Sequence, residues 1–280
     1  YDMDRYNNNY KNVNKFLEDN NINAIELFGL QLYNEELIPK DKIIGAHLMH
    51  YPVWLDFWNE DEEGLFEEFS SKEDIINYYG KLDKKVIIDK YREEIKLAEK
   101  LNAEYAVFHV SNVRTKDCFN YEFTYTDKEV VDATIEIVNE IFKGLDNNIT
   151  ILFENLWWPG LKMTDPELVR YFIENIEYKN KGIMLDTGHL LNTNLDINNE
   201  EEGIDYLVET ISNLGDMKDY IKGIHLSKSL SGKYVKEQIE KYKNKDIDYS
   251  EVNNEIIYHI LNIDEHKPFT NNKINNLLMK

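Results

Sequence analysis

Six short apolar runs, rich in β-branched and aromatic residues, recur along the chain and predict β-strands. Most are separated by stretches long enough for a helix; Lys84 to Leu101, for example, has apolar residues at helical spacing. Strands that alternate with helices are typical of a parallel sheet. A chain of 280 residues suits one (β/α)8 barrel of about 250 residues, so we predict an α/β fold and a single domain over residues 1–280. The runs are residues 24–28, 43–47, 105–109, 149–154, 182–186 and 222–225.

The two ends of the chain show no further strand pattern. The first clear pattern is a helix around Val13 to Leu17, and residues 252–263 have apolar spacing typical of a helix, as does Ile274 to Met279. Strands 1 and 8 of the predicted barrel are therefore not visible in the sequence. We expect strand 1 to precede Tyr1 and strand 8 to follow Lys280.

Three of the apolar runs stop on a side chain that can bind a metal ion. One ends on Glu154, the next on Asp186 with His189 three residues later, and the last on His225. Because the carboxyl ends of parallel barrel strands open onto one face, we expect Glu154, Asp186 and His225 to converge. Two carboxylates and an imidazole suit a divalent ion, so we predict one Mn, Co, Mg or Zn ion. His109 ends a further run and adds a candidate ligand, so that a second ion is possible.

Composition limits the partners of the chain. The net charge of −21, without a cluster of Lys or Arg, argues against a nucleic acid or an anionic membrane as partner. No apolar run approaches the roughly 18 residues of a membrane span. The single cysteine, Cys118, excludes an intrachain disulfide and a thiolate zinc site. We expect a cytoplasmic protein, and a homo-oligomer remains open.

The strand-end motifs resemble those of a known family. Glu154-Asn155, Asp186-Thr187-Gly188-His189 and His225-Leu226 are similar to the strand-5, strand-6 and strand-7 motifs of the xylose-isomerase-like TIM barrels. That superfamily contains metal-dependent sugar isomerases and epimerases as well as AP endonucleases of the endonuclease IV type. The resemblance implies that Glu154, Asp186 and His225 bind a divalent metal and that a strand-8 Glu completes the ligands. No strand-8 sequence is visible, and Asp264 and Glu265 are poor substitutes in a helical context.

The same resemblance gives roles to the other histidines. The residue matching His189 contacts substrate in the isomerases and binds a further metal in the endonucleases. Histidines at the ends of strands 3 and 4, here His47 or His50 and His109, hold an additional zinc in the endonucleases. That pattern also needs an Asp-x-His pair soon after the strand-7 His, and residues 227–234 contain neither residue. We therefore do not expect a complete trinuclear zinc site.

These residues predict a sugar or sugar-phosphate isomerase or epimerase that acts through an enediolate. Glu154 would move the proton, and His189 or Lys228 would stabilise the developing oxyanion. Lys228 stands where the family often has an acid. A metal-dependent phosphodiester hydrolase resembling an AP endonuclease and a non-catalytic metal- or sugar-binding barrel remain alternatives. The substrate would be a small carbohydrate bound against aromatic side chains at the barrel mouth and a histidine beside them, namely Trp54, Trp58, Trp157, Trp158 and His50.

Three further expectations concern residues outside this set. Glu26, on the first predicted strand, is expected to be structural or to support a ligand from outside. His259 and His266, in the helical tail, are expected at the surface. The segment from Trp54 to Gly80 follows a strand end and is expected over the mouth of the barrel as a lid.

Overall fold

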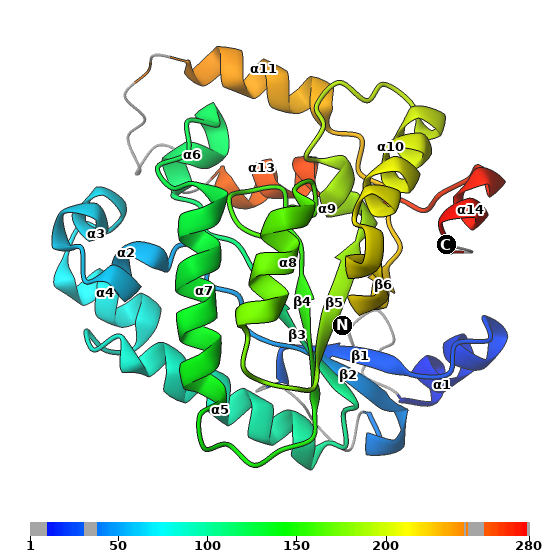
Figure 1. Cartoon of the computed structure of the whole chain (residues 1–280), viewed down its shortest axis with the longest axis horizontal. Coiled ribbons are helices and arrows are strands. Elements are labelled where there is room, and N and C mark those ends of the chain that lie inside the picture. The colour runs from blue at the N-terminus through cyan, green and yellow to red at the C-terminus, as the bar shows by residue number, and fades with distance from the viewer. Residues whose placement is uncertain (1–9, 31–37, 244, 246–254, 279–280) are drawn as a thin grey trace.

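A computed structural model describes residues 10–30, 38–243, 245 and 255–278. Six strands alternate with helices along the chain (Figure 1). The strands are β1 (Ile25–Phe28), β2 (Ile43–His47), β3 (Tyr105–His109), β4 (Thr150–Glu154), β5 (Lys181–Asp186) and β6 (Ile221–His225). The longer helices are α1 (Tyr10–Asp19), α5 (Lys85–Lys100), α7 (Asp127–Phe142), α8 (Pro166–Asn175), α10 (Glu200–Asn213) and α11 (Gly232–Tyr242). The shorter ones are α2 (Leu55–Asn59), α3 (Glu62–Glu68), α4 (Lys72–Tyr79), α6 (Thr115–Asn120), α9 (Thr187–Leu191), α13 (Ile256–Ile263) and α14 (Asn275–Leu278), with 3-10 turns η3 (Lys40–Lys42), η4 (Gly215–Tyr220) and η5 (Asn272–Ile274).

All six predicted strands are present, each within one residue of its expected bounds. They form one parallel sheet in the order β1-β2-β3-β4-β5-β6. The sheet is curled, as in a (β/α)8 barrel (Figure 1), and the described residues contain six strands. Within this part of the chain β1 and β6 are the two edges of the sheet and do not pair with each other. The barrel prediction is therefore confirmed.

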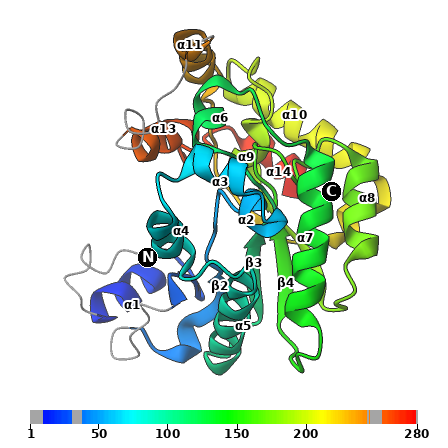
Figure 2. The same cartoon turned by 90° about the vertical axis from the view of Figure 1, so that its left-hand side faces the viewer.

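The main core lies between the outer face of the sheet and the helices that cover it. Ala106 and Phe108 of β3 point outward, as do Ile151 and Phe153 of β4, and all are buried in this core. Helices α5, α7, α8 and α10 cover this face of the sheet (Figures 1 and 2). Their buried side chains complete the core. Helix α7 begins with a capping box at Thr126 and Glu129, which satisfies amide groups at its first turn. This layer fixes the strands from outside and leaves their inner side chains for the site.

The inner face of the sheet has a small apolar layer below the strand ends. Val107, Leu152 and Met184 are buried there, with Tyr105 against them. Gly45 of β2 faces the Tyr105 ring, and a Cβ at this glycine would come within 2.2 Å of that ring. A side chain at position 45 would therefore displace Tyr105. The apolar layer forms a floor beneath the polar residues at the carboxyl ends of the strands.

Five successive strands end on a side chain able to bind a metal ion. In chain order these last residues are His47, His109, Glu154, Asp186 and His225. The register pairs His109 with Glu154 and Asp186 with His225 across neighbouring strands. Since alternate residues of a strand point to one face, all five side chains lie on the inner side. The predicted convergence of strand ends is thus a direct result of sheet register.

The segment from Trp54 to Gly80 forms α2, α3 and α4, and several contacts hold it to the barrel. Asp56 of α2 makes an ion pair with the buried Arg114, with an oxygen–nitrogen distance of 2.8 Å. Tyr79 Oη donates to the Val53 carbonyl at 2.6 Å. Glu68 accepts hydrogen bonds from Thr115. In this structure the segment is therefore fastened to the loop after β3.

The C-terminal part departs from one surface expectation. His259 lies on α13, as the helical pattern predicts, but only 1% of this residue is exposed. Its ring stacks on Phe119 and contacts the Tyr234 hydroxyl and the Cys118 carbonyl. The prediction that His259 is a surface residue is wrong, because α13 packs its histidine face against α6 and α11. None of the helices in the described ranges is long and apolar enough to cross a membrane.

Candidate metal centre

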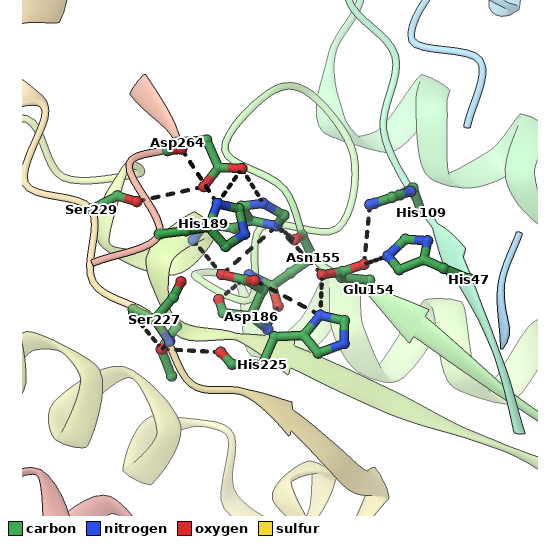
Figure 3. Close-up of polar contacts among 12 residues, drawn as sticks. His47, His109, Glu154, Asn155, Asp186, His189, His225, Ser227, Ser229 and Asp264 are labelled. Atoms are coloured by element: carbon green, nitrogen blue, oxygen red, sulfur yellow. Dashed lines mark hydrogen bonds and ion pairs between the residues drawn. The ribbon is translucent and has the colours of Figure 1, made fainter. Parts of the chain in front are cut away.

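Glu154 lies at the centre of the site with each carboxylate oxygen facing a different set of imidazoles (Figure 3). Its Oε2 lies 3.1 Å from His47 Nε2 and 3.0 Å from His109 Nε2. Its Oε1 lies 2.7 Å from His225 Nδ1. The carboxylate is 1% exposed. This is the arrangement of a carboxylate that can bridge two cations.

Asp186 supplies a second buried carboxylate beside Glu154. Its Oδ1 accepts the His189 backbone N–H at 2.8 Å, which caps the short helix α9. Its Oδ2 lies 3.8 Å from His225 Nδ1 and has no hydrogen-bond donor among the described residues. Glu154, Asp186 and His225 can present ligand atoms that all lie within 4.8 Å of one another. The structure thus brings together the three residues that the sequence predicted to converge.

A third group, which the sequence analysis did not identify, forms around His189. His189 Nε2 lies 3.4 Å from Asp264 Oδ2, and Asp264 in turn lies 3.1 Å from His266 Nδ1. Asp186, His189 and His266 can present ligand atoms within 4.8 Å of one another. Asp264 and His266 form an Asp-x-His pair, which residues 227–234 lack. The pair reaches the site after helices α11 and α13, whereas residues 227–234, directly after β6, contain neither residue, as the sequence analysis states.

His266 lies at the surface, as predicted, with 56% of its side chain exposed. It nevertheless lines the same pocket as Asp264, which is 15% exposed. The pocket has a volume of about 590 Å³ and opens at the carboxyl ends of the strands. Its remaining lining residues are Glu26, Phe28, His47, His109, Glu154, Asp186, His189, His225, Leu226 and Ser227. The three groups therefore share one cavity.

The carboxylates and imidazoles shift one another's pKa. Burial alone would raise the pKa of Glu154, but the histidines His109, His225 and His47 outweigh it and hold the pKa well below its usual value. Burial raises the pKa of Asp186, and the charge of Glu154 adds to the effect. Two carboxylates this close cannot both ionise freely without positive charge between them.

Three histidines of the site differ in the direction of their pKa shift. Burial lowers the pKa of His109. Burial would also lower that of His225, but Glu154 and Glu26 raise its pKa to about 10. Burial would lower the pKa of His189 as well, but Asp186, Asp264 and Glu154 raise this pKa to about 10. Without metal, His189 and His225 therefore carry the positive charge that offsets the carboxylates.

The donor set fits divalent cations. Oε2 of Glu154 and Oδ2 of Asp186 are buried without a correctly directed hydrogen bond, and a buried carboxylate oxygen in that state is costly unless a cation neutralises it. Imidazole and carboxylate ligands together suit zinc, manganese or cobalt. Three overlapping groups meet the distance requirement. They are His47, His109 and Glu154; Glu154, Asp186 and His225; and Asp186, His189 and His266.

Asn155 connects β4 to β5 directly behind the ligands. Its side-chain amide donates to the Asp186 carbonyl at 3.0 Å and its Oδ1 accepts the Asp186 N–H at 2.9 Å. The carbonyl of Asn155 lies 2.8 Å from His189 Nδ1. Because a carbonyl oxygen only accepts, His189 Nδ1 donates its N–H to Asn155, and this bond orients the ring so that Nε2 faces Asp264. The Asn of the Glu154-Asn155 motif therefore orients two candidate ligands.

The four tryptophans that were predicted to contact the substrate lie outside the pocket. Trp54, Trp58, Trp157 and Trp158 are each at most 8% exposed, and none lines the cavity. Trp54 donates its indole N–H to the Ser111 carbonyl. Trp58 donates to Glu136. Trp157 alone approaches a candidate ligand, with 5.1 Å between its ring and that of His189. The tryptophans are therefore buried among other parts of the barrel, and they do not form a wall of this cavity.

His50 lies behind the site. Its ring is 4.4 Å from the His109 ring, and burial lowers its pKa well below the usual range. It lines a separate cavity of about 10 Å³ with Tyr51, Trp54 and Tyr91. His47, which the sequence left as one of two choices, is the histidine that faces Glu154. His50 thus backs the His109 ring rather than contacting the large pocket.

Lys228 turns away from the metal ligands. Its ammonium pairs with Glu200 at the start of α10, and its backbone forms an antiparallel bridge with Lys267. Lys228 does not line the pocket. Its contacts instead hold the segment that follows His266. The sequence analysis did not include Glu26 among the candidate ligands. In the structure its Oε2 lies 3.2 Å from Nε2 of the candidate ligand His225.

The comparisons with known proteins agree with this architecture. A family model for the xylose isomerase-like TIM barrel matches residues 59–275 of the 280. A search of curated proteins finds no match. Among solved structures, a D-tagatose 3-epimerase-like protein is 17% identical, with 90% of this chain and 93% of that chain covered and a TM-score of 0.43.

Two further solved structures have similar sequence identities and TM-scores. The 3-keto-D-glucoside 4-epimerase from E. coli is 11% identical over 87% of this chain and 90% of its own, with a TM-score of 0.46. The probable 3-DHS dehydratase from Bacillus anthracis is 17% identical over 81% and 70%, with a TM-score of 0.45. The family model covers most of the chain, and the chain therefore belongs to the xylose isomerase-like TIM barrel family.

Proposed function

We propose that this chain is a metal-dependent hydrolase of phosphoesters whose site holds two or three divalent ions. The observation that carries this proposal is the division of the Glu154 carboxylate between His47 and His109 on one oxygen and His225 on the other. A carboxylate placed in this way could contribute a ligand to each of two cations. A pair of cations would stabilise both the attacking and the leaving oxygen of an in-line displacement.

The residues of the chain divide the binding of the ions among them. His47, His109 and Glu154 would hold one ion, and Glu154, Asp186 and His225 a second. His189, Asp264 and His266, with Asp186, would hold a third at the pocket rim. When bound, the ions supply Lewis acidity and neutralise negative charge on the phosphate.

The pocket itself lacks the charge to bind a phosphate. Among the described residues that line it there is neither Lys nor Arg, whereas four carboxylates point into it, from Glu26, Glu154, Asp186 and Asp264. An anionic substrate therefore requires bound cations. The net charge of −21 favours a small phosphoester over a long nucleic acid, which basic surfaces bind.

A sugar isomerase or epimerase with one ion is the second candidate. It is favoured by the compact Glu154, Asp186 and His225 set, which is sufficient for one divalent ion. In that reaction Glu154 would take a proton from the carbon beside a carbonyl and return it. Oε1 of Glu154 is hydrogen-bonded to His225, and Oε2 lies 3.0 Å from His109 Nε2, so imidazoles crowd both oxygens where a substrate proton would have to approach. For this reason we rank the isomerase below the hydrolase.

Metal stoichiometry and turnover test the two candidates together. The purified chain is loaded with zinc or manganese, its metal content is determined by elemental analysis, and bis(p-nitrophenyl) phosphate and a panel of ketohexoses are offered as substrates. Two or more equivalents with phosphodiester cleavage support the proposal. One equivalent with sugar conversion supports the isomerase, and bound metal without turnover indicates a binding protein.

A pair of variants serves as control for the same measurement. Glu154→Gln removes the shared carboxylate and is expected to lose metal and turnover together. Glu68→Gln changes another buried carboxylate, whose partner is Thr115 rather than an imidazole. It is expected to keep the metal content of the parent chain. Equal metal content in parent and Glu154→Gln would contradict the proposal.

A further inference from the structure

Two of the histidines at the pocket have one ring nitrogen facing the ligands and the other held by a separate group. For His189, the Asn155 carbonyl lies 2.8 Å from Nδ1, and Nε2 faces Asp264. For His225, Nδ1 faces Glu154 at 2.7 Å and Nε2 lies 3.2 Å from Oε2 of Glu26. A histidine that binds a metal through one nitrogen commonly donates the other N–H to a carboxylate or carbonyl. Glu26 occupies that position for His225.

Glu26 reaches His225 across the open side of the sheet. It stands on β1 and His225 on β6, the two strands that form the edges of the described sheet. No backbone hydrogen bond joins these strands in the described part of the chain, so the side-chain contact is what connects them. Tyr105, on β3, also interacts electrostatically with Glu26. The Glu26 and His225 side chains are 21% and 26% exposed, so water competes only in part.

We propose that Glu26 is a positioning residue of the metal centre, which accepts the Nε2–H of His225 and so leaves the Nδ1 lone pair for the ion that Glu154 and Asp186 would also bind. This inference rests on the metal site of the proposed function. A neutral imidazole carries its proton on one nitrogen only, and the group bonded to that nitrogen selects the tautomer. With the proton on Nδ1 instead, an N–H would point at the ion and His225 could not bind it. The negative charge of Glu26 also makes His225 a stronger ligand.

Zinc affinity measured by competition with a chromophoric chelator tests the proposal on the full chain. Glu26→Gln keeps the size of the side chain but loses the charge, and its amide can also donate to Nε2 and favour the wrong tautomer. We expect affinity at the His225 position to fall by roughly 10- to 100-fold, the usual cost of losing such a partner. Glu26→Ala should fall at least as far. Glu68→Gln is the matched control and should bind zinc like the parent.

A spectroscopic measurement on the unaltered chain keeps the test independent of folding in the variants. In the zinc-loaded protein, nitrogen-15 NMR of the histidine rings should show His225 with zinc at Nδ1 and the proton at Nε2. Zinc at Nε2, or unchanged affinity in Glu26→Gln, would overturn the inference while leaving the proposed function in place. Zinc binding that Glu26→Gln weakens, without phosphodiester cleavage by the parent, would overturn the proposed function alone. A parent chain that binds no zinc would overturn both.

Discussion

The two sides of the pocket are built in different ways. On one side His47, His109 and Glu154 are the last residues of β2, β3 and β4, and we call them the strand-end group. On the other side His189, Asp264 and His266 lie on a short helix and on the segment after α13, and we call them the loop group. Asp264 is 75 residues beyond His189 in the chain. Sheet register alone aligns the first group, whereas packing of two further helices brings the second together.

This difference teaches how one barrel can carry several kinds of chemistry. Strand ends of a parallel barrel are held rigidly from outside by the helix layer, so ligands placed there keep their spacing. Loop residues depend on contacts that are made far along the chain, and they can be gained or lost without disturbing the sheet. In the proposed function the strand-end group would bind the first ions. The loop group would bind a further ion.

The largest expected effect comes from Glu154→Gln, since Glu154 belongs to two of the three ligand groups. An amide oxygen is a weak ligand and cannot bridge two cations. We expect the metal content to fall below one equivalent and turnover to fall by more than the roughly 100-fold that loss of an outer partner costs. Elemental analysis and a phosphodiesterase assay measure both. A variant that keeps two equivalents would show that the two groups do not share this carboxylate.

Asp264→Asn with His266→Ala should have the next largest effect and should separate the two groups. The double variant removes the Asp-x-His pair but leaves the strand-end ligands intact. We expect loss of one equivalent of metal, with the tighter equivalents retained, as measured by titration with zinc. His47→Ala is the matched change on the other side. If both variants lose the same ion, the distinction between the groups is wrong.

The two groups should respond in opposite directions to pH in metal-free protein. His189 has a pKa raised to about 10, so its stabilising contribution is complete below the unfolded value of 6.5 and is lost as pH rises toward 10. His109 has a lowered pKa, so its contribution is present above 6.5 and is lost as pH falls through the lowered value. Urea unfolding in a chelator should therefore show a free energy of unfolding that declines at both ends of this range.

Single variants assign the two limbs of that profile. His189→Asn should flatten the decline on the alkaline side, and His109→Asn the decline on the acid side below pH 6.5. The pKa of His225 is also raised to about 10, so His225 contributes to the decline of stability on the alkaline side. This decline should therefore become smaller in His189→Asn but should not disappear. An unchanged alkaline limb in a His189→Asn, His225→Asn double variant would contradict the assignment.

The smallest expected effect comes from Glu200→Gln. Glu200 accepts the backbone N–H groups of Thr270 and Asn271 at 2.6 Å and pairs with Lys228, and so holds the segment that follows His266. Loss of its charge should weaken zinc binding at the loop group by less than roughly tenfold, since a partly exposed ion pair is worth about 1 kcal/mol or less. Binding at the strand-end group should not change. An equal loss at both groups, in the same zinc titration, would show that Glu200 acts on the whole fold.

Sequence pattern predicted the sheet well because its signals are local. An apolar run that ends on Glu154, Asp186 or His225 identifies both the strand and the residue at its carboxyl end. Parallel alignment then brings those residues to one edge whatever the helices do. The Asp-x-His pattern of Asp264 and His266 was visible in the sequence, but its distance from His225 hid its relation to the site. Burial of the tryptophans and of His259 depends on long-range packing, which periodicity does not describe.

The sequence by itself determined the α/β architecture, six strands and the strand-end ligands, because alternation and chain direction fix where the last side chain of each parallel strand points. Tertiary structure alone decided that His47 rather than His50 faces Glu154 and that Asp264 and His266 join His189. It also decided that Glu26 contacts His225 across the open side of the sheet. These are contacts between residues far apart in the chain, and their geometry depends on how helices and strand edges pack in three dimensions.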